Sequence, residues 1–145
     1  MSVKQISVFV ENTPGELSKF VDVLSDNHID MRALSIAETR DFGILRIIVD
    51  DAYEASTVLK SAGYILKITP VLAAAVPDEP GALKKILKVL EENQINVEYT
   101  YAFITRDKDI AYMVFRLDDP SQDKAEELLS RAGVRLLDQS ELQEL

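Results

Sequence analysis

The chain has 145 residues, of which 47% are hydrophobic, and it contains no cysteine. Disulfide scaffolds and thiol chemistry are therefore excluded, and a cytoplasmic location is expected because a reducing compartment suits this composition. The 25 acidic and 16 basic residues give a net charge of −9, which argues against nucleic acid and membranes as partners, since both favour a basic surface. No apolar run approaches the roughly 20 residues of a membrane span.

The first half of the chain alternates between strand and helix patterns. Val8 and Val10 belong to a period-two run, whereas Leu17, Phe20 and Leu24 recur at helical spacing. The patterns predict strand, helix, strand, strand, helix and strand over residues 3–10, 14–27, 30–39, 43–49, 52–62 and 64–69.

The second half repeats the first. Residues 12–17, Asn-Thr-Pro-Gly-Glu-Leu, return 66 positions later as Asp-Glu-Pro-Gly-Ala-Leu at residues 78–83. Residues 27–31, Asn-His-Ile-Asp-Met, return at the same spacing as Asn-Gln-Ile-Asn-Val. A repeat that spans several elements indicates a duplicated domain. We expect two domains, residues 1–69 and residues 70–145.

The order βαββαβ in each copy predicts an α+β fold of two tandem ferredoxin-like domains, with antiparallel sheets and helices on one face. Such a unit leaves one sheet face and its strand edges open, and proteins normally cover these. We expect the cover to be another copy, either within the chain or from a second chain in a homodimer.

Each proline-glycine corner offers backbone donors to a ligand. The N–H groups of Gly15, Glu16 and Leu17 precede the first intrahelical hydrogen bonds, and the positive end of the helix dipole lies beside them, which suits a carboxylate. The corresponding residues of the second copy are Gly81, Ala82 and Leu83.

Polar side chains flank both corners, and each has two interpretations. Asn12 and Asp78 either act as N-cap or turn residues, with no ligand, or contact a ligand directly. Asp30 and Asn96 begin the second strand of each copy, where they are either ordinary turn residues or partners for an amino group. Because these polar residues carry different charges in the two copies, we expect the two sites to be non-equivalent. In the extreme case, one of the sites is empty.

The corners, the Ile-Asp-Met and Ile-Asn-Val segments and the βαββαβ order resemble the ACT domain family. From residue 3 to about residue 140, the chain is similar to small stand-alone proteins made of two tandem ACT domains. The resemblance implies a regulatory module that binds an amino acid at an ACT–ACT interface, through the first loop and the start of the second strand. Carried onto this chain, the contacts are Asn12, Thr13, Gly15, Glu16, Asp30 and Met31 in the first copy and Asp78, Glu79, Gly81, Ala82, Asn96 and Val97 in the second. Some serine-binding members have a histidine where this chain has Val10 and Val76, so serine is not implied.

We therefore expect a non-enzymatic, amino-acid-binding regulatory protein that acts on a separate enzyme or regulator, without a cofactor or a metal ion. His28 is the sole histidine and has no second metal ligand at a suitable spacing. Two alternatives remain, a ligand-free assembly module and an acyl-phosphate hydrolase on the same scaffold. The hydrolase would need an arginine in the first loop, which contains Asn12 but no arginine.

Overall fold

The computed structural model describes residues 2–145, which divide into two compact units. The N-terminal unit is Lys4–Thr69, and the C-terminal unit is Pro70–Leu145 together with residues 2 and 3. Strand β4 (Leu66–Pro77) runs through the boundary between Thr69 and Pro70, so the chain passes from one copy to the next within a single strand. Within residues 2–145, no helix is both long and apolar enough to cross a bilayer.

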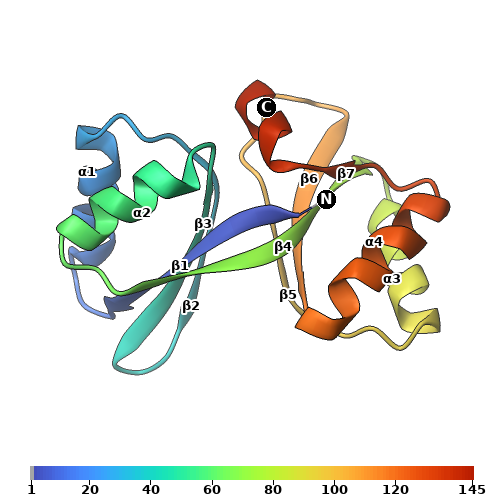
Figure 1. Cartoon of the computed structure of the whole chain (residues 1–145), viewed down its shortest axis with the longest axis horizontal. Helices are drawn as coiled ribbons and strands as arrows, with labels where there is room; N and C mark the ends of the chain where they lie inside the picture. The colour runs from blue at the N-terminus through green and yellow to red at the C-terminus, as the bar shows by residue number, and fades with distance from the viewer. Residues whose placement is uncertain (1) are drawn as a thin grey trace. The chain divides into compact units, whose positions relative to one another are not determined.

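The N-terminal unit has the predicted βαββαβ order, and its two helices lie on one side of its sheet (Figure 1). Its strands are ordered β2-β3-β1-β4, and β3 is antiparallel to both β1 and β2. Alternate residues of β1, including Val8 and Val10, pack with Phe20 and Leu24 of α1 and Leu59 of α2 in one apolar core. The elements are β1 (Val3–Glu11), α1 (Glu16–Asp26), β2 (Met31–Glu38), β3 (Phe42–Val49), α2 (Ala52–Ser61) and the first part of β4.

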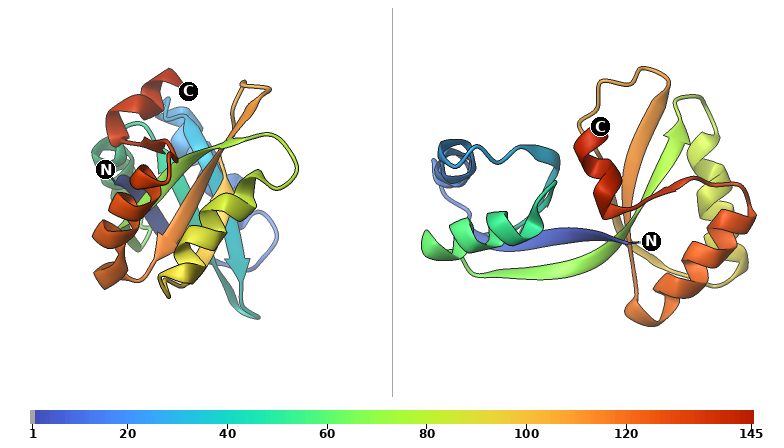
Figure 2. Two further views of the ribbon diagram at one scale, coloured as in Figure 1. Left: turned by 90° about the vertical axis from the view of Figure 1, so that its right-hand side faces the viewer. Right: turned by 45° about the horizontal axis from the view of Figure 1, so that its top comes forward.

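The C-terminal unit repeats this arrangement, and helices α3 and α4 lie side by side on one face of its strands (Figure 2). Strand β4 is antiparallel to β6 and to the short β7, and β6 is antiparallel to β5. Ile86 and Leu90 of α3 join Ala125 and Leu129 of α4 in the second core. The elements are α3 (Ala82–Glu92), β5 (Val97–Ala102), β6 (Ile110–Leu117), η1 (Asp119–Ser121), α4 (Gln122–Arg131), β7 (Leu136–Leu137) and η2 (Gln139–Glu144).

The first helix of each copy begins later than the sequence pattern predicts. Helix α1 starts at Glu16 and not at Pro14, because Gly15 adopts a left-handed conformation with φ 86° as the N-cap. Gly81 has the same φ before α3. The corners are therefore turns outside the helices, and a glycine is required there because other residues are strained at this φ. Leu17, which the pattern places inward, is 40% exposed.

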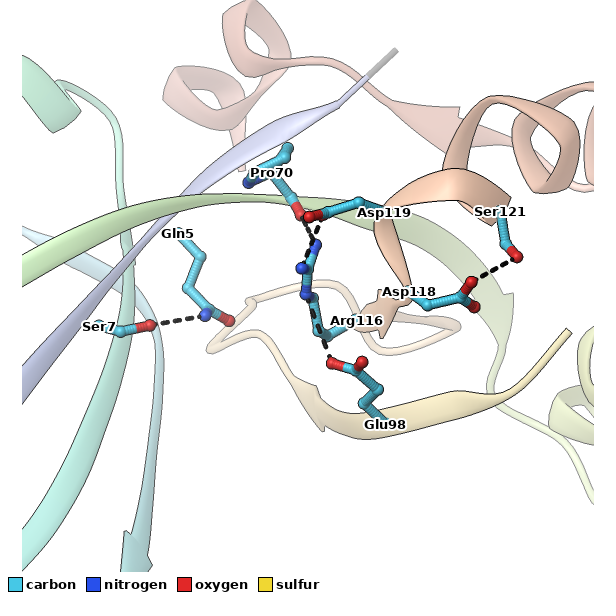
Figure 3. Close-up of polar contacts among 8 residues, drawn as sticks. All are labelled: Gln5, Ser7, Pro70, Glu98, Arg116, Asp118, Asp119 and Ser121. Carbon is cyan, nitrogen blue, oxygen red and sulfur yellow. Dashed lines mark hydrogen bonds and ion pairs between the residues drawn. The ribbon is translucent and has the colours of Figure 1, made fainter.

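Arg116 on β6 ties the start of the second copy together (Figure 3). Its guanidinium donates to the carbonyl oxygen of Pro70 at 3.0 Å and to the Asp119 carboxylate at 2.7 Å. The Glu98 carboxylate lies 3.6 Å from its Nε. One side chain thus joins β4, β5, β6 and η1.

The face of the second sheet opposite its helices includes fully buried side chains. Ala73, Val114 and Leu137 alternate with the core residues of their strands and point away from the helices, yet all three are fully buried within the single chain. The C-terminal segment is a 3-10 helix whose Leu142 is 0% exposed. Its first residues are fixed by a capping box between Asp138 and Glu141.

Candidate functional site

The two proline-glycine corners have matching backbone geometry. The Glu16 N–H donates to the Thr13 carbonyl oxygen at 3.3 Å, and the Ala82 N–H donates to that of Glu79 at the same distance. These bonds use one of the three donors that the sequence offers at each corner. The N–H groups on either side have no hydrogen-bond partner in the part of the chain that the structure describes; they belong to Gly15, Leu17, Gly81 and Leu83.

The side chain of Asn12 has a structural role. Its amide nitrogen donates to the carbonyl oxygen of Thr39 at 3.1 Å, and its backbone N–H donates to that of Asp41 at 3.2 Å. Asn12 therefore holds the β2–β3 turn against the first corner. In the second copy the Asp78 N–H donates to the Asp109 carbonyl oxygen at 2.7 Å, but a carboxylate supplies no second donor.

The residues predicted at the start of the second strand do not converge on a cavity within either unit. Met31 and Val97 are partly buried against the two cores. The Asp30 carboxylate is 74% exposed and lies 3.6 Å from Nη1 of Arg32. Asn96 is exposed.

The second corner opens onto a cavity of about 520 Å³ within the C-terminal unit. This volume lies within the range of small-molecule sites, roughly 300–1,000 Å³. Three of the predicted site residues line it, namely Glu79, Gly81 and Ala82. The other lining residues are Ala75, Val76, Pro77, Pro80, Lys85, Ile86, Ile110, Gly133, Val134 and Arg135.

Two cationic side chains of this cavity were not singled out from the sequence. The ammonium nitrogen of Lys85 lies 3.7 Å from the point where a Cβ on Gly133 would stand, so Lys85 reaches across the cavity from α3 to the end of α4. Lys85 follows Gly81 by four residues, and helical side chains lean toward the N-terminus, so this spacing was an available signal. Arg135 is joined to Glu141 at 3.2 Å, and that hydrogen bond raises the pKa of Arg135.

At the equivalent place in the first copy, two of the protein's own aromatic side chains meet. The rings of Phe20 and Tyr64 meet edge to face, with centroids 5.4 Å apart and an interplanar angle of 83°. Burial, and to a lesser extent the Glu16 carboxylate, raise the pKa of Tyr64. The Tyr64 hydroxyl is buried, and no partner for it exists among residues 2–145.

The backbone shows which residues of the two copies correspond. The Phe9 N–H donates to the Ile65 carbonyl oxygen at 3.1 Å, and the Ala75 N–H donates to that of Arg135 at 2.9 Å. By this register Tyr64 corresponds to Val134, and the repeat spacing pairs Phe20 with Ile86 and Glu16 with Ala82.

Comparison with known proteins identifies the family. A family model described as an ACT domain pair matches residues 1–145. The chain belongs to the ACT domain family. A search of curated proteins gives no match for this ACT domain pair.

Solved structures with the same fold include protein BT0572 from Bacteroides thetaiotaomicron, which is 39% identical, covers 100% of this chain and 98% of its own, and has a TM-score of 0.91. The regulatory subunit of aspartate kinase from Thermus thermophilus is 15% identical, with a TM-score of 0.67, over 91% of this chain and 93% of that one. The corresponding subunit from Thermus flavus is 14% identical, with a TM-score of 0.63, over 92% and 94%. The ACT domain pair therefore has the predicted α+β fold. In its described residues no group of three or more potential ligands could hold a metal ion.

Proposed function

We propose that this ACT domain pair is a non-catalytic sensor that binds a free amino acid and regulates a separate protein. The observation that carries the proposal is the cavity of the C-terminal unit, which is lined by Gly81 of the corner and by the charged residues Glu79 and Lys85.

The chemistry of the lining suits both ends of a zwitterion. The carboxylate would accept from the N–H group of Gly81 at the positive end of α3 and would lie near the Lys85 ammonium. The amino group would lie near the Glu79 carboxylate. The acyl-phosphate hydrolase alternative is not favoured, because neither corner carries the loop arginine that it would need.

The affinity that this chemistry permits is modest. Two or three charge-assisted hydrogen bonds contribute about 1.5–3 kcal/mol each, and the ligand's lost freedom offsets much of this. A net binding free energy of about −4 to −8 kcal/mol corresponds to dissociation constants from millimolar to micromolar, which suits the sensing of a metabolite pool. Bound ligand shifts only those states that it binds unequally, so regulation requires a change that the partner protein detects.

A thermal-shift screen of the twenty amino acids tests the proposal. A ligand at a hundredfold excess over its Kd should raise the melting temperature by about 5 °C or more. Lys85→Gln should lower the affinity about tenfold, because it removes the cation opposite the carboxylate. Lys19→Gln, the same change at the corresponding position of the first copy, should have no effect. If none of the twenty raises the melting temperature, the ligand-free assembly module becomes the better account.

The proposal includes a homodimer. Among the described strands β2 pairs with β3 alone, so its other edge has unpaired backbone groups, and its Leu34 and Ile36 are exposed. An apolar edge strand is a template for a second copy. Sedimentation should give a dimer that Ile36→Lys converts to a monomer, while Tyr53→Lys at the more exposed surface of α2 leaves it intact. A monomeric wild-type protein would overturn this part.

A further inference from the structure

Resting on the proposed function, we infer that the chain binds one ligand, in the C-terminal unit alone, and that this ligand is an amino acid with an apolar side chain. The first copy is closed by its own residues. The inference starts from one comparison, between the cavity at the second corner and the packed aromatic pair at the first.

The closure of the first copy follows from side-chain size. Phe20 is fully buried and meets the ring of Tyr64, whereas the second copy has the smaller Ile86 and Val134 at the corresponding positions, and both line the cavity. Two aromatic side chains occupy space that two aliphatic ones leave open. Because protein interiors are close-packed, the first copy has no room for a ligand between the same elements.

The closure also involves charge. Glu16 is the first residue of α1, so its carboxylate sits at the positive end of the helix dipole, where a ligand's carboxylate would otherwise lie. It is close enough to Tyr64 to contribute to the raised pKa of that hydroxyl. The second copy has Ala82 there, which adds no charge and leaves the helix end available.

The lining of the open cavity selects the ligand's side chain. Its walls are mainly aliphatic, from Val76, Ile86, Ile110 and Val134. The charged groups, Glu79 and Lys85, match the two charges of the amino acid itself, and Arg135 is already paired with Glu141. A polar side chain would lose its water against the aliphatic walls without a new partner, which is unfavourable. Leucine, isoleucine, valine, methionine and phenylalanine are thus the expected class.

Isothermal titration with L-leucine, L-isoleucine, L-valine, L-methionine and L-phenylalanine, against L-serine, L-aspartate and L-lysine, tests the inference. We expect one site per chain and at least about tenfold tighter binding for the apolar group. Val134→Tyr with Ile86→Phe should remove binding. Ala82→Glu is the milder variant, since glutamate is favourable in a first helical turn, and it should weaken binding about tenfold while the fold is kept.

The reciprocal variant Phe20→Ile, Tyr64→Val, Glu16→Ala should add a second site to the same chain. Two sites in the wild-type protein, tighter binding of a polar amino acid, or full affinity in folded Ala82→Glu would each overturn this inference while the sensor function stands. Absence of binding by all eight amino acids would overturn the inference, and the screen of all twenty then decides the sensor function separately.

Discussion

The Nη1 of Arg116 donates to the carbonyl oxygen of Pro70 at 3.0 Å, 46 residues away in sequence (Figure 3). Pro70 lies at the point where β4 passes from the N-terminal to the C-terminal unit. The same guanidinium contacts Glu98 and Asp119, and its side chain is only 12% exposed. Arg116 is therefore the polar centre around which the first strand of the second copy is fixed.

Arg116→Met should lower the free energy of unfolding by about 1–3 kcal/mol, because a carbonyl oxygen and two carboxylates lose a charged donor. Urea denaturation measures this directly. Arg131→Met is the matched control, since Arg131 pairs with Glu127 at the exposed surface of α4 and such pairs contribute about 0–1 kcal/mol. Equal effects of the two substitutions would show that Arg116 is no more than a surface pair.

Tyr64 should make stability depend on alkaline pH. Its pKa in the folded state is raised above the ordinary value of 10.0, so folding favours the neutral phenol. The stabilisation is complete below pH 10 and is lost as the pH rises through the higher folded-state pKa. Urea denaturation at pH 8 and pH 10.5 should show a steeper loss in the wild-type protein than in Tyr64→Phe. Parallel losses in both proteins would show that Tyr64 does not titrate differently on folding.

Leu142→Ala should lower the free energy of unfolding by about 2–5 kcal/mol, because it leaves a cavity at a fully buried position. Gln143→Ala at the neighbouring exposed position should change it by less than about 0.5 kcal/mol. Chemical denaturation of both variants provides the comparison. A small effect of Leu142→Ala would mean that the C-terminal segment lies loosely on the protein.

The C-terminal segment should also loosen in acid. The Ser140 hydroxyl and the backbone N–H groups of Glu141 and Ser140 hydrogen-bond the Asp138 carboxylate and lower its pKa below the usual 3.8. The contribution of this capping box is present above pH 3.8 and is lost as the pH falls through the lower folded-state pKa. Hydrogen exchange at residues 139–144 should therefore accelerate at low pH relative to Asp138→Asn, which cannot titrate. Identical profiles would contradict this.

Much of the fold could be predicted because it depends on local sequence patterns. The period-two run of β1 and the stripe of Phe20 and Leu24 depend only on residues within one element. The corners were also visible, since proline followed by glycine marks a chain reversal whatever surrounds it. The exact start of the first helix could not be predicted. It depends on whether Gly15 adopts a positive φ, and the proline-glycine motif is compatible with a positive or a negative φ.

The cavity could not be predicted because its walls come from distant parts of the chain. Nothing local relates Phe20 to Tyr64, or Ile86 to Val134, until the last strand of each copy lies beside its first helix. The sequence did predict that the two sites are non-equivalent, but on the charges of Asn12, Asp78 and their partners. We infer a difference instead from the bulk of two side chains, and Asp78 does not line the cavity. Leu142 escaped prediction likewise, since its acidic neighbours favour a surface position.

The most direct measurement follows the four open corner amides by two-dimensional ¹H–¹⁵N NMR during titration with the amino acid found in the screen. Binding at the second corner predicts large, saturable shifts for Gly81, whose N–H group would donate to the ligand's carboxylate, and smaller ones for the neighbouring Leu83. The amide signals of Gly15 and Leu17, which lie at the corner of the copy that has the Phe20–Tyr64 pair, should not move. Equal shifts at both corners, or shifts at neither while binding is measured, would contradict the account.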